Sequence, residues 1–334
     1  MNSIPKLLQT SKLSDGRIPF HPLVMQFACR FINKTYEEFM CDYRVLVESN
    51  LRCIEAFDHD AVSVISDPFR ETSAFGAHIT FDGNASPKAE HIISVQEDVD
   101  RLIIPDVYEC ARTLDRIKGV ELFRKELGQL FPIIAWVEGP LAESCDLTGV
   151  SELLIQMMLE PDMVHQLMNK CLEMAKQFAL AQIKAGANIV GVGDAICSQI
   201  PPETYEEFVM PLHQELFSFI HQQGALVKLH ICGNITHLLS HIAKTGADIV
   251  DLDWMVSFVE ARQVLGPEVW LCGNTDPVSV IQNGPDDLLI KDIEQIKLLE
   301  KDNKWIFSGG CEITPFTSVE KMKLIRKVTY SKLI

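Results

Sequence analysis

The sequence lacks any apolar run near the ~18 residues that a membrane-spanning helix needs. Its first stretch, MNSIPKLLQTSKLSDG, also lacks the apolar core of a secretory signal. We therefore expect a cytoplasmic protein that does not enter a membrane. The 10 cysteines are scattered along the chain, and in that compartment we expect reduced thiols. Where reduced cysteines cluster in a cytoplasmic protein, they bind metal or take part in catalysis more often than they form disulfides.

Positive charge is also scarce. The chain has 30 Lys and Arg against 46 Asp and Glu, which gives a formal net charge of -16. Nucleic acids and anionic membrane surfaces would repel such a chain, so neither is expected as a partner. An apolar content of 47% with 23% charged residues is typical of a soluble globular protein. The acidic field suits an enzyme with a small-molecule substrate or a protein partner.

No linker, short repeat or low-complexity segment divides the chain, so we expect one domain over residues 1–334. Short apolar runs alternate with longer amphipathic ones, as in a parallel sheet covered on both faces. The predicted strands are 61–66, 131–137, 188–193, 226–232, 248–254, 269–274 and 305–311. This alternation predicts an α/β fold, a (β/α)8 TIM barrel with an N-terminal helical extension and one strand irregular or undetected. A doubly wound sheet is the alternative, but the glycine fingerprint of a dinucleotide fold is absent.

Proline and capping residues predict several helix boundaries. Pro201 and Pro202 open a helix that Gly224 can end, and Pro211 should kink it. Capping boxes are predicted at Ser94 with Glu97, Ser257 with Glu260, and Thr317 with Glu320.

Two residues of the run KLHICGNITHLL, residues 228–239, share one face of a predicted strand. Side chains alternate between the faces of a strand, so His230 and Cys232 project together from its C-terminal end. A second predicted strand ends in WIFSGGCEITP, with Cys311 at its end. Active sites of barrels are built where the strands end, and only barrel closure would bring Cys311 beside the first pair.

One imidazole and two thiolates form a ligand set that zinc prefers. Three protein ligands with an open fourth position are typical of a catalytic zinc. The alternative is a buried cysteine and a hydrogen-bonded histidine without metal. The other cysteines are interpreted as packing residues, with Cys197 and Cys272 as the only rivals for a ligand role.

Further polar residues stand at the ends of other predicted strands. Any one of them could be a helix cap, but so many at one end of a barrel predict a polar mouth. These residues are Asp67, Glu138, Asp194, Asp253, Asn274 and Asp276.

Several segments resemble the uroporphyrinogen decarboxylase superfamily over nearly the whole chain. They are VISDPFRETSAFGA, PPETYEEFVMPL, ADIVDLDWMVSFVEARQVLG, LCGNTDPVSVI and GGCEITPFTS. Within the superfamily, LHICGN followed by GGCEITP resembles the zinc-dependent methylcobamide:thiol methyltransferases. Their His-x-Cys…Cys motif falls on His230, Cys232 and Cys311.

The chain departs from genuine decarboxylases at deciding positions. Where they carry MRQAGR, this chain has MQFACR, so Arg30 is retained and Gln26 replaces an arginine. Cys311 stands in place of a histidine, and the catalytic tyrosine segment falls near Asp146. The essential aspartate is matched by Asp67. A tetrapyrrole with several carboxylates needs a basic pocket, and part of that pocket is missing here.

The resemblance implies a zinc-dependent methyltransferase. Such an enzyme uses Zn²⁺ and takes a methyl group from a methylcobamide, carried by a small corrinoid protein, to a small-molecule acceptor such as coenzyme M or tetrahydrofolate. Asp194 and Glu138 are then candidate catalytic residues, and both are also candidates, with Glu312, for the fourth zinc ligand. Candidate substrate-binding residues are Arg30, Asp67, Asp253 and Asn274.

Two other functions stay open: a metal-free uroporphyrinogen decarboxylase, and a non-catalytic corrinoid-binding relative. The acceptor and the original methyl donor stay open too, and the protein is expected as a monomer or homodimer.

Overall fold

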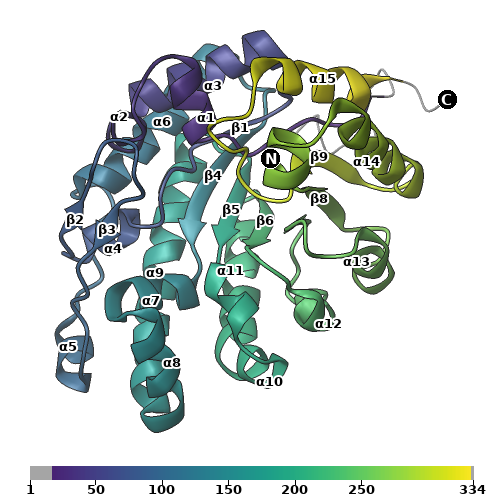
Figure 1. Ribbon diagram of the computed structural model, residues 1–334. Coiled ribbons are helices and arrows are strands. Elements are labelled where there is room, and N and C mark those ends of the chain that lie inside the picture. Colours follow the sequence, from purple (N-terminus) through teal and green to yellow (C-terminus); the bar gives the residue numbers. More distant parts are fainter. Residues whose placement is uncertain (1–16, 332–334) are drawn as a thin grey trace.

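The computed structural model describes residues 17–331 and shows a curled sheet of seven parallel strands wrapped by helices (Figure 1). The strand order is β1-β4-β5-β6-β7-β8-β9, so every neighbour follows in chain order and every crossover carries helices. The seven strands are β1 (Val62–Ser63), β4 (Ile133–Glu138), β5 (Ile189–Gly193), β6 (Leu226–Ile231), β7 (Ile249–Leu252), β8 (Trp270–Thr275) and β9 (Trp305–Gly309). Each lies within or beside a predicted strand, which confirms the α/β class.

The predicted eighth strand is absent from the sheet over residues 17–331. Its place is taken by the segment 19–21, which forms a single parallel bridge between Phe20 and Phe307 of β9. On the other side, the Phe20 carbonyl accepts a hydrogen bond from Asp60 N–H at 2.9 Å, two residues before β1. The Asp60 carboxylate in turn accepts from Phe20 N–H at 2.9 Å. The short segment thus lies between the two end strands of the sheet.

The predicted N-terminal helical extension is confirmed, since three helices precede β1: α1 (Gln26–Phe31), α2 (Tyr36–Cys41) and α3 (Tyr43–Phe57). A small antiparallel pair, β2 (Ile79–Thr80) and β3 (Lys88–Ala89), follows α4 (Arg70–Ala74). The next helices are α5 (Gln96–Arg101), α6 (Ala111–Leu127), α7 (Pro140–Thr148), α8 (Val150–Leu159) and α9 (Pro161–Ala185).

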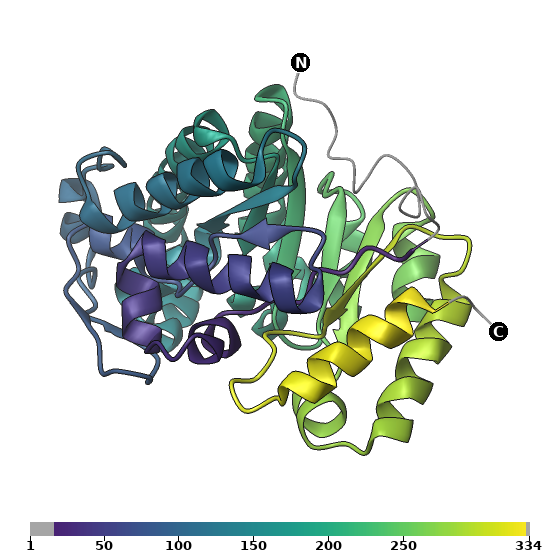
Figure 2. The same cartoon turned by 90° about the horizontal axis from the view of Figure 1, so that it is seen from above.

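Shorter helical turns are frequent after β5. They are η2 (Ala195–Gln199), α10 (Pro202–Thr204), η3 (Tyr205–Val209), α11 (Met210–Gln222), η4 (Thr236–Leu238) and α12 (Leu239–Ile242). The remaining helices are α13 (Phe258–Leu265), η5 (Pro277–Gln282), α14 (Asp286–Leu299) and α15 (Val319–Tyr330). Seen from above, α14 and α15 pack together on the opposite side of the molecule from α7 and α9 (Figure 2). No helix among the described residues is long and apolar enough to cross a membrane.

The predicted helix after Pro201 forms with an irregular first half. Its start is α10, followed by the π-helical turn η3 and then by the regular helix α11. The π turn ends two residues before Pro211, whose nitrogen has no hydrogen to donate to the preceding turn. The proline therefore changes the helix type at the predicted position.

Only part of each predicted capping box forms. The Ser257 hydroxyl accepts from the Glu260 N–H at the start of α13, which is one of the two hydrogen bonds of the predicted box. In the other two segments the capping residue differs by one position from the predicted one. At α15 the cap is Ser318, which accepts from Lys321 N–H, and at α5 the carboxylate of Asp98 accepts from the two N–H groups before the helix. Each of these segments has capping residues at adjacent positions, so the sequence pattern alone could not choose between them.

Candidate metal centre

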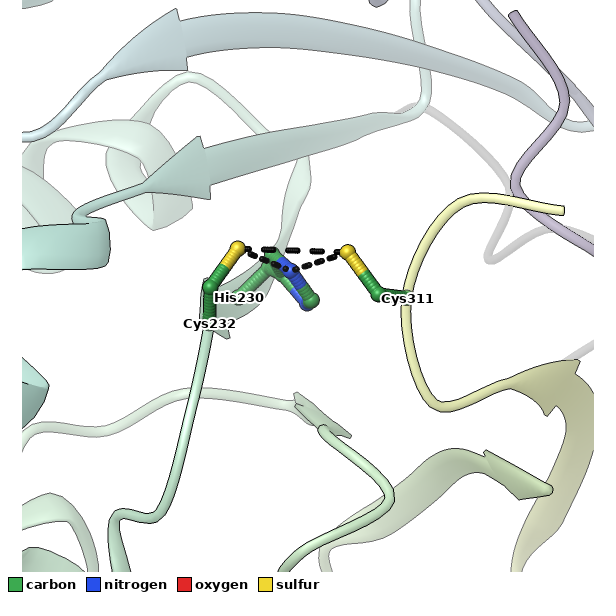
Figure 3. Close-up of side chains that lie close together, drawn as sticks. All are labelled: His230, Cys232 and Cys311. Atoms are coloured by element: carbon green, nitrogen blue, oxygen red, sulfur yellow. Dashed lines mark hydrogen bonds between the residues drawn. The ribbon is translucent and has the colours of Figure 1, made fainter. Parts of the chain in front are cut away.

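Three side chains from two distant strands meet where the strands end (Figure 3). His230 is the fifth residue of β6, Cys232 follows that strand directly, and Cys311 lies two residues beyond β9. Nε2 of His230 lies 3.1 Å from Sγ of Cys232 and 4.0 Å from Sγ of Cys311. The two sulfurs are 4.0 Å apart. The two cysteines are partly exposed and the histidine is buried, so the cluster opens on one side only.

The three donor atoms have the spacing of a tetrahedral metal site. Sulfur ligands at ~2.3 Å from a tetrahedral zinc lie ~3.8 Å apart, and a sulfur and a nitrogen ligand lie ~3.6 Å apart. The observed separations are 4.0 Å for the sulfurs and 3.1 and 4.0 Å for nitrogen and sulfur. Movements of a few tenths of an ångström would bring all three atoms into one coordination shell. The residues therefore fit a zinc ion with one further position left for a small ligand.

The three side chains of the cluster shift one another's pKa values. Hydrogen bonding from Cys232, which outweighs burial, lowers the pKa of the Cys311 thiol to about 4. The same bond, together with burial, raises the pKa of Cys232. Burial lowers the pKa of His230, but the charge of Cys232 and hydrogen bonds with its neighbours raise it well above the ordinary value. The Cys311 thiolate therefore supplies a negative charge at the site, and a metal bound at His230 would take the place of the ring proton.

The other ring nitrogen of His230 faces a buried ion pair. Nδ1 lies 3.4 Å from Oδ2 of Asp251, which itself lies 2.8 Å from Nζ of Lys228. Lys228 is 1% exposed and Asp251 is 2% exposed. Neither Lys228 nor Asp251 was predicted from the sequence as part of the site. The alternation of side chains in KLHIC could have indicated Lys228, because it puts this residue on the same strand face as His230 and Cys232.

Close backbone packing brings Cys311 to the other two ligands. Gly310 passes so near to Trp254 that an added Cβ would lie 2.3 Å from the Trp254 backbone nitrogen. Any side chain at this position would push the strand end away. On the opposite side of the cluster, Gly233 has φ +92°, a conformation that suits glycine, and turns the chain directly after Cys232.

Asp253, predicted to bind substrate, holds this turn in place, and Asn274, also predicted to bind substrate, holds the segment that carries Asp253. The Asp253 carboxylate accepts from Gly233 N–H and from Trp254 N–H, both at 2.6 Å. The Asn274 amide donates to the carbonyls of Asp253, at 3.1 Å, and Val256, at 2.7 Å. Both side chains thus bind backbone groups beside the metal ligands.

Glu312, considered as a fourth ligand, is bound to the helical extension. Its Oε1 accepts from the N–H of Gln26, the first residue of α1, at 2.6 Å. Burial raises the pKa of this carboxyl to about 7. The residue therefore connects the segment after β9 to α1, immediately beside Cys311.

Glu138 lies at the end of β4 within a group of buried carboxyls. Its Oε1 is 3.0 Å from a guanidinium nitrogen of Arg70, and its backbone N–H donates to Glu71 at 2.9 Å. Burial raises the pKa of Glu138 and of Glu143 well above the ordinary value, and that of Asp146 to about 8. Several acidic side chains thus surround Arg70. A pocket that binds a polycarboxylate would instead be lined with basic side chains.

Asp194, the other predicted catalytic residue, is fully buried after β5. Its Oδ1 accepts from the N–H of Ala142 in the first turn of α7 at 2.8 Å, and its Oδ2 lies 3.0 Å from Nε2 of His213. The hydroxyl of Tyr205 lies 2.9 Å from the other ring nitrogen of His213. Asp194, His213 and Cys197 form a second group of possible metal ligands, but all three are buried and Asp194 already has partners on both oxygens.

Asp67 and Arg30 lie in different surroundings. Asp67 is 4% exposed, and Oδ2 lies 2.6 Å from Arg112 and accepts from the Ser66 hydroxyl. Arg30 is exposed, with its guanidinium 4.5 Å from the ring centroid of Phe316. The structure therefore brings together the three predicted metal ligands, with Asp253 and Asn274 beside them. Asp67 and Arg30 are bound elsewhere and make none of the contacts among those ligands.

Comparison with known proteins gives two kinds of relative. The sequence model of the family described as Uroporphyrinogen decarboxylase (URO-D) matches residues 12–330. Uroporphyrinogen decarboxylase of Geobacter sulfurreducens is 27% identical over 269 residues, which is 78% of this chain and 77% of that protein. The enzyme of the same name from Carboxydothermus hydrogenoformans is 28% identical over 292 residues, covering 85% and 82%.

Among solved structures, a methyltransferase from Methanosarcina mazei aligns with a TM-score of 0.85 over 94% of this chain and 93% of its own, at 21% identity. A B12-independent methionine synthase from Shewanella aligns with a TM-score of 0.58 at 13% identity, over 96% of both chains. These likenesses show the fold, and the family match covers almost all of the sequence. The chain belongs to the uroporphyrinogen decarboxylase family.

Proposed function

We propose that this protein is a zinc-dependent methyltransferase that moves a methyl group from a methylated corrinoid, carried by a small partner protein, to a thiol or similar small acceptor. The observation that carries the proposal is the meeting of one imidazole and two sulfurs, all within 4.8 Å of one another, where parallel strands end. The likeness of LHICGN and GGCEITP to the methylcobamide:thiol methyltransferases supports it. The shared fold of the Methanosarcina methyltransferase agrees with it.

The chemistry follows from the donor set. When bound, Zn²⁺ would lower the pKa of an acceptor thiol and so favour its nucleophilic form at neutral pH. Cys232 and Cys311 would hold the ion as thiolates that neutralise its charge, and His230 would be a neutral third ligand. Cys232 and Cys311 are partly exposed, so a small acceptor can reach the open side of the cluster. The turn at Gly233, whose N–H donates to the Asp253 carboxylate, keeps these ligands in place while the two substrates are aligned.

The roles of the predicted catalytic residues differ. Glu138 retains 8% exposure and a raised carboxyl pKa, so we propose it as the group that exchanges a proton with the bound acceptor. Asp194 has no exposure and holds α7 against the end of β5. We therefore propose a positioning role for Asp194.

Uroporphyrinogen decarboxylation is the second candidate, because the matched relatives carry that name. The geometry supports it poorly. The oxygens of Asp67 accept from Arg112, Ser66 and the Phe69 N–H and have few lone pairs left for a pyrrole. Gln26, which replaces an arginine, offers no charge to a propionate. The carboxyls around Glu138 also offer no positive charge to a substrate with many carboxylates.

The test is demethylation of methylcobalamin, followed by its absorbance, with zinc-loaded protein and a panel of thiols and tetrahydrofolate. Wild type should transfer the methyl group to at least one acceptor, and Cys232→Ala should lose at least about 100-fold in rate, because a metal ligand is missing. Cys41→Ser, which removes an exposed cysteine, is the matched control and should keep wild-type activity. Equal rates for wild type and Cys232→Ala would contradict the proposal, and turnover of uroporphyrinogen at ordinary enzymatic rates would favour the second candidate.

A further inference from the structure

A lysine is buried directly beneath the candidate metal ligands. Lys228 precedes His230 by two residues on β6, so both side chains point to the same face of the strand. It is 1% exposed, and lysine is almost never buried to this extent unless it is paired. Its Nζ lies 2.8 Å from Oδ2 of Asp251 on the neighbouring strand β7. Burying two charges is costly, and packing alone would be served better by apolar residues at these positions.

Asp251 connects this lysine to the histidine. The strand register pairs Asp251 directly with His230, and Oδ2 lies 3.4 Å from Nδ1 of the ring. Nδ1 is buried and forms no hydrogen bond within normal limits in the described part of the chain. The opposite nitrogen, Nε2, is the one that faces the two sulfurs. A small rotation of the ring would let Nδ1–H donate to Asp251, which leaves the lone pair of Nε2 for a metal.

We propose that Asp251 and Lys228 are positioning residues for His230, with Asp251 orienting the ring and Lys228 holding the carboxylate in place. The inference rests on the proposed function, because it takes His230 to be a metal ligand. Lys228 balances the charge of Asp251, and without it the carboxylate would be a buried anion without a counter-ion. Such a group does not stay beside the ring. Both residues therefore act on the metal through one contact.

The contribution of the contact between Asp251 and His230 can be measured as a change in metal affinity. Zn²⁺ affinity, determined by competition with a chromophoric chelator, should fall 10- to 100-fold in Asp251→Asn and in Lys228→Met. The double variant should bind no more weakly than Asp251→Asn alone, because both changes remove the same orienting contact. Lys228→Arg keeps the charge and should retain most of the affinity. In Co²⁺-loaded variants the sulfur-to-cobalt absorption should persist, since both cysteines are intact.

Lys297→Met is the matched control, because Lys297 is also 1% exposed and paired with an acid, Glu294, but lies on α14. It should bind Zn²⁺ like wild type. Wild-type affinity in Asp251→Asn, or losses that multiply in the double variant, would overturn the inference. If Lys228→Met does not fold, Asp251→Asn decides, since it keeps the size of the side chain. A wild type that binds no Zn²⁺ would instead contradict the proposed function itself.

Discussion

At the scale of single residues, two glycines determine whether the three predicted metal ligands can meet. Gly233 has φ +92° and turns the chain after Cys232, and an added Cβ there would lie 3.0 Å from the Ser198 hydroxyl. Gly310 precedes Cys311 and lies against the backbone of Trp254, where no side chain fits. Neither glycine has a side chain that could bind a metal. Their contribution is to bring the ligands within reach of one another.

Gly310→Ala should therefore weaken metal binding more than it weakens the fold. The added methyl group must displace the end of β9 or the Trp254 backbone, which moves Cys311 by a large fraction of a coordination distance. We expect Zn²⁺ affinity to fall on the order of tenfold or more, measured by chelator competition. Gly119→Ala, in α6 with its nearest neighbour at 3.4 Å, is the control and should keep wild-type affinity. Wild-type affinity in Gly310→Ala would show that the strand end is pliable and the argument wrong.

At the scale of elements, the segment 19–21 joins the two end strands of the sheet. It bonds to β9 through Phe20 and Phe307 and to residue 60 before β1. The ring of His59 lies edge-on to Phe20, with 5.3 Å between centroids. Burial lowers the pKa of His59 to about 3, so the ring is neutral in the folded protein at neutral pH. The packing of segment 19–21 between the two end strands thus depends on an uncharged His59.

Acid should therefore destabilise the packing of segment 19–21 against His59. The folded-state pKa of His59, about 3, lies below the ordinary value of 6.5, so its stabilising effect is present above pH 6.5 and is lost as the pH falls toward 3. Between pH 6.5 and 5 the free energy of unfolding should drop by about 2 kcal/mol through this group. Denaturant unfolding of wild type and of His59→Leu at both pH values measures the effect. A pH dependence that is the same in both proteins would rule it out.

Strand positions could be predicted from the sequence because apolar runs mark strands that are buried on both faces. The strand-end pair His230 and Cys232 could be predicted too, since i and i+2 side chains share a face within any register. Contacts between strands could not. Lys228 was missed because its partner, Asp251, comes from another strand, and only the register of β6 with β7 places the two side by side. Arg70, in a short helix, was missed for the same reason, since its partner Glu138 is 68 residues away.

At the scale of the whole molecule, the metal would connect parts of the fold that are far apart in sequence. Its ligands come from β6 and from the segment after β9, and Glu312 bonds that segment to α1. A ligand that binds only the folded state stabilises it in proportion to the logarithm of its concentration. Under the proposed function, the stability of the chain would therefore depend on zinc.

Zinc should raise the unfolding temperature of the metal-free protein. At a free Zn²⁺ concentration of 100 times Kd the added free energy of unfolding is about 2.7 kcal/mol. Differential scanning calorimetry with and without zinc should show this increase for wild type and for Cys41→Ser. Cys311→Ser, which lacks one sulfur ligand, should show little of it. A similar increase in Cys311→Ser would locate the stabilising zinc elsewhere on the molecule.

The identity of the ligands can be measured by zinc X-ray absorption on purified protein, together with its zinc content. The account predicts about one zinc per chain, with two sulfurs at ~2.3 Å and a histidine nitrogen at ~2.0–2.1 Å, and the loss of one sulfur from the shell in Cys311→Ser. A protein that binds no zinc, or a zinc shell in Cys311→Ser identical to that of wild type, would contradict it.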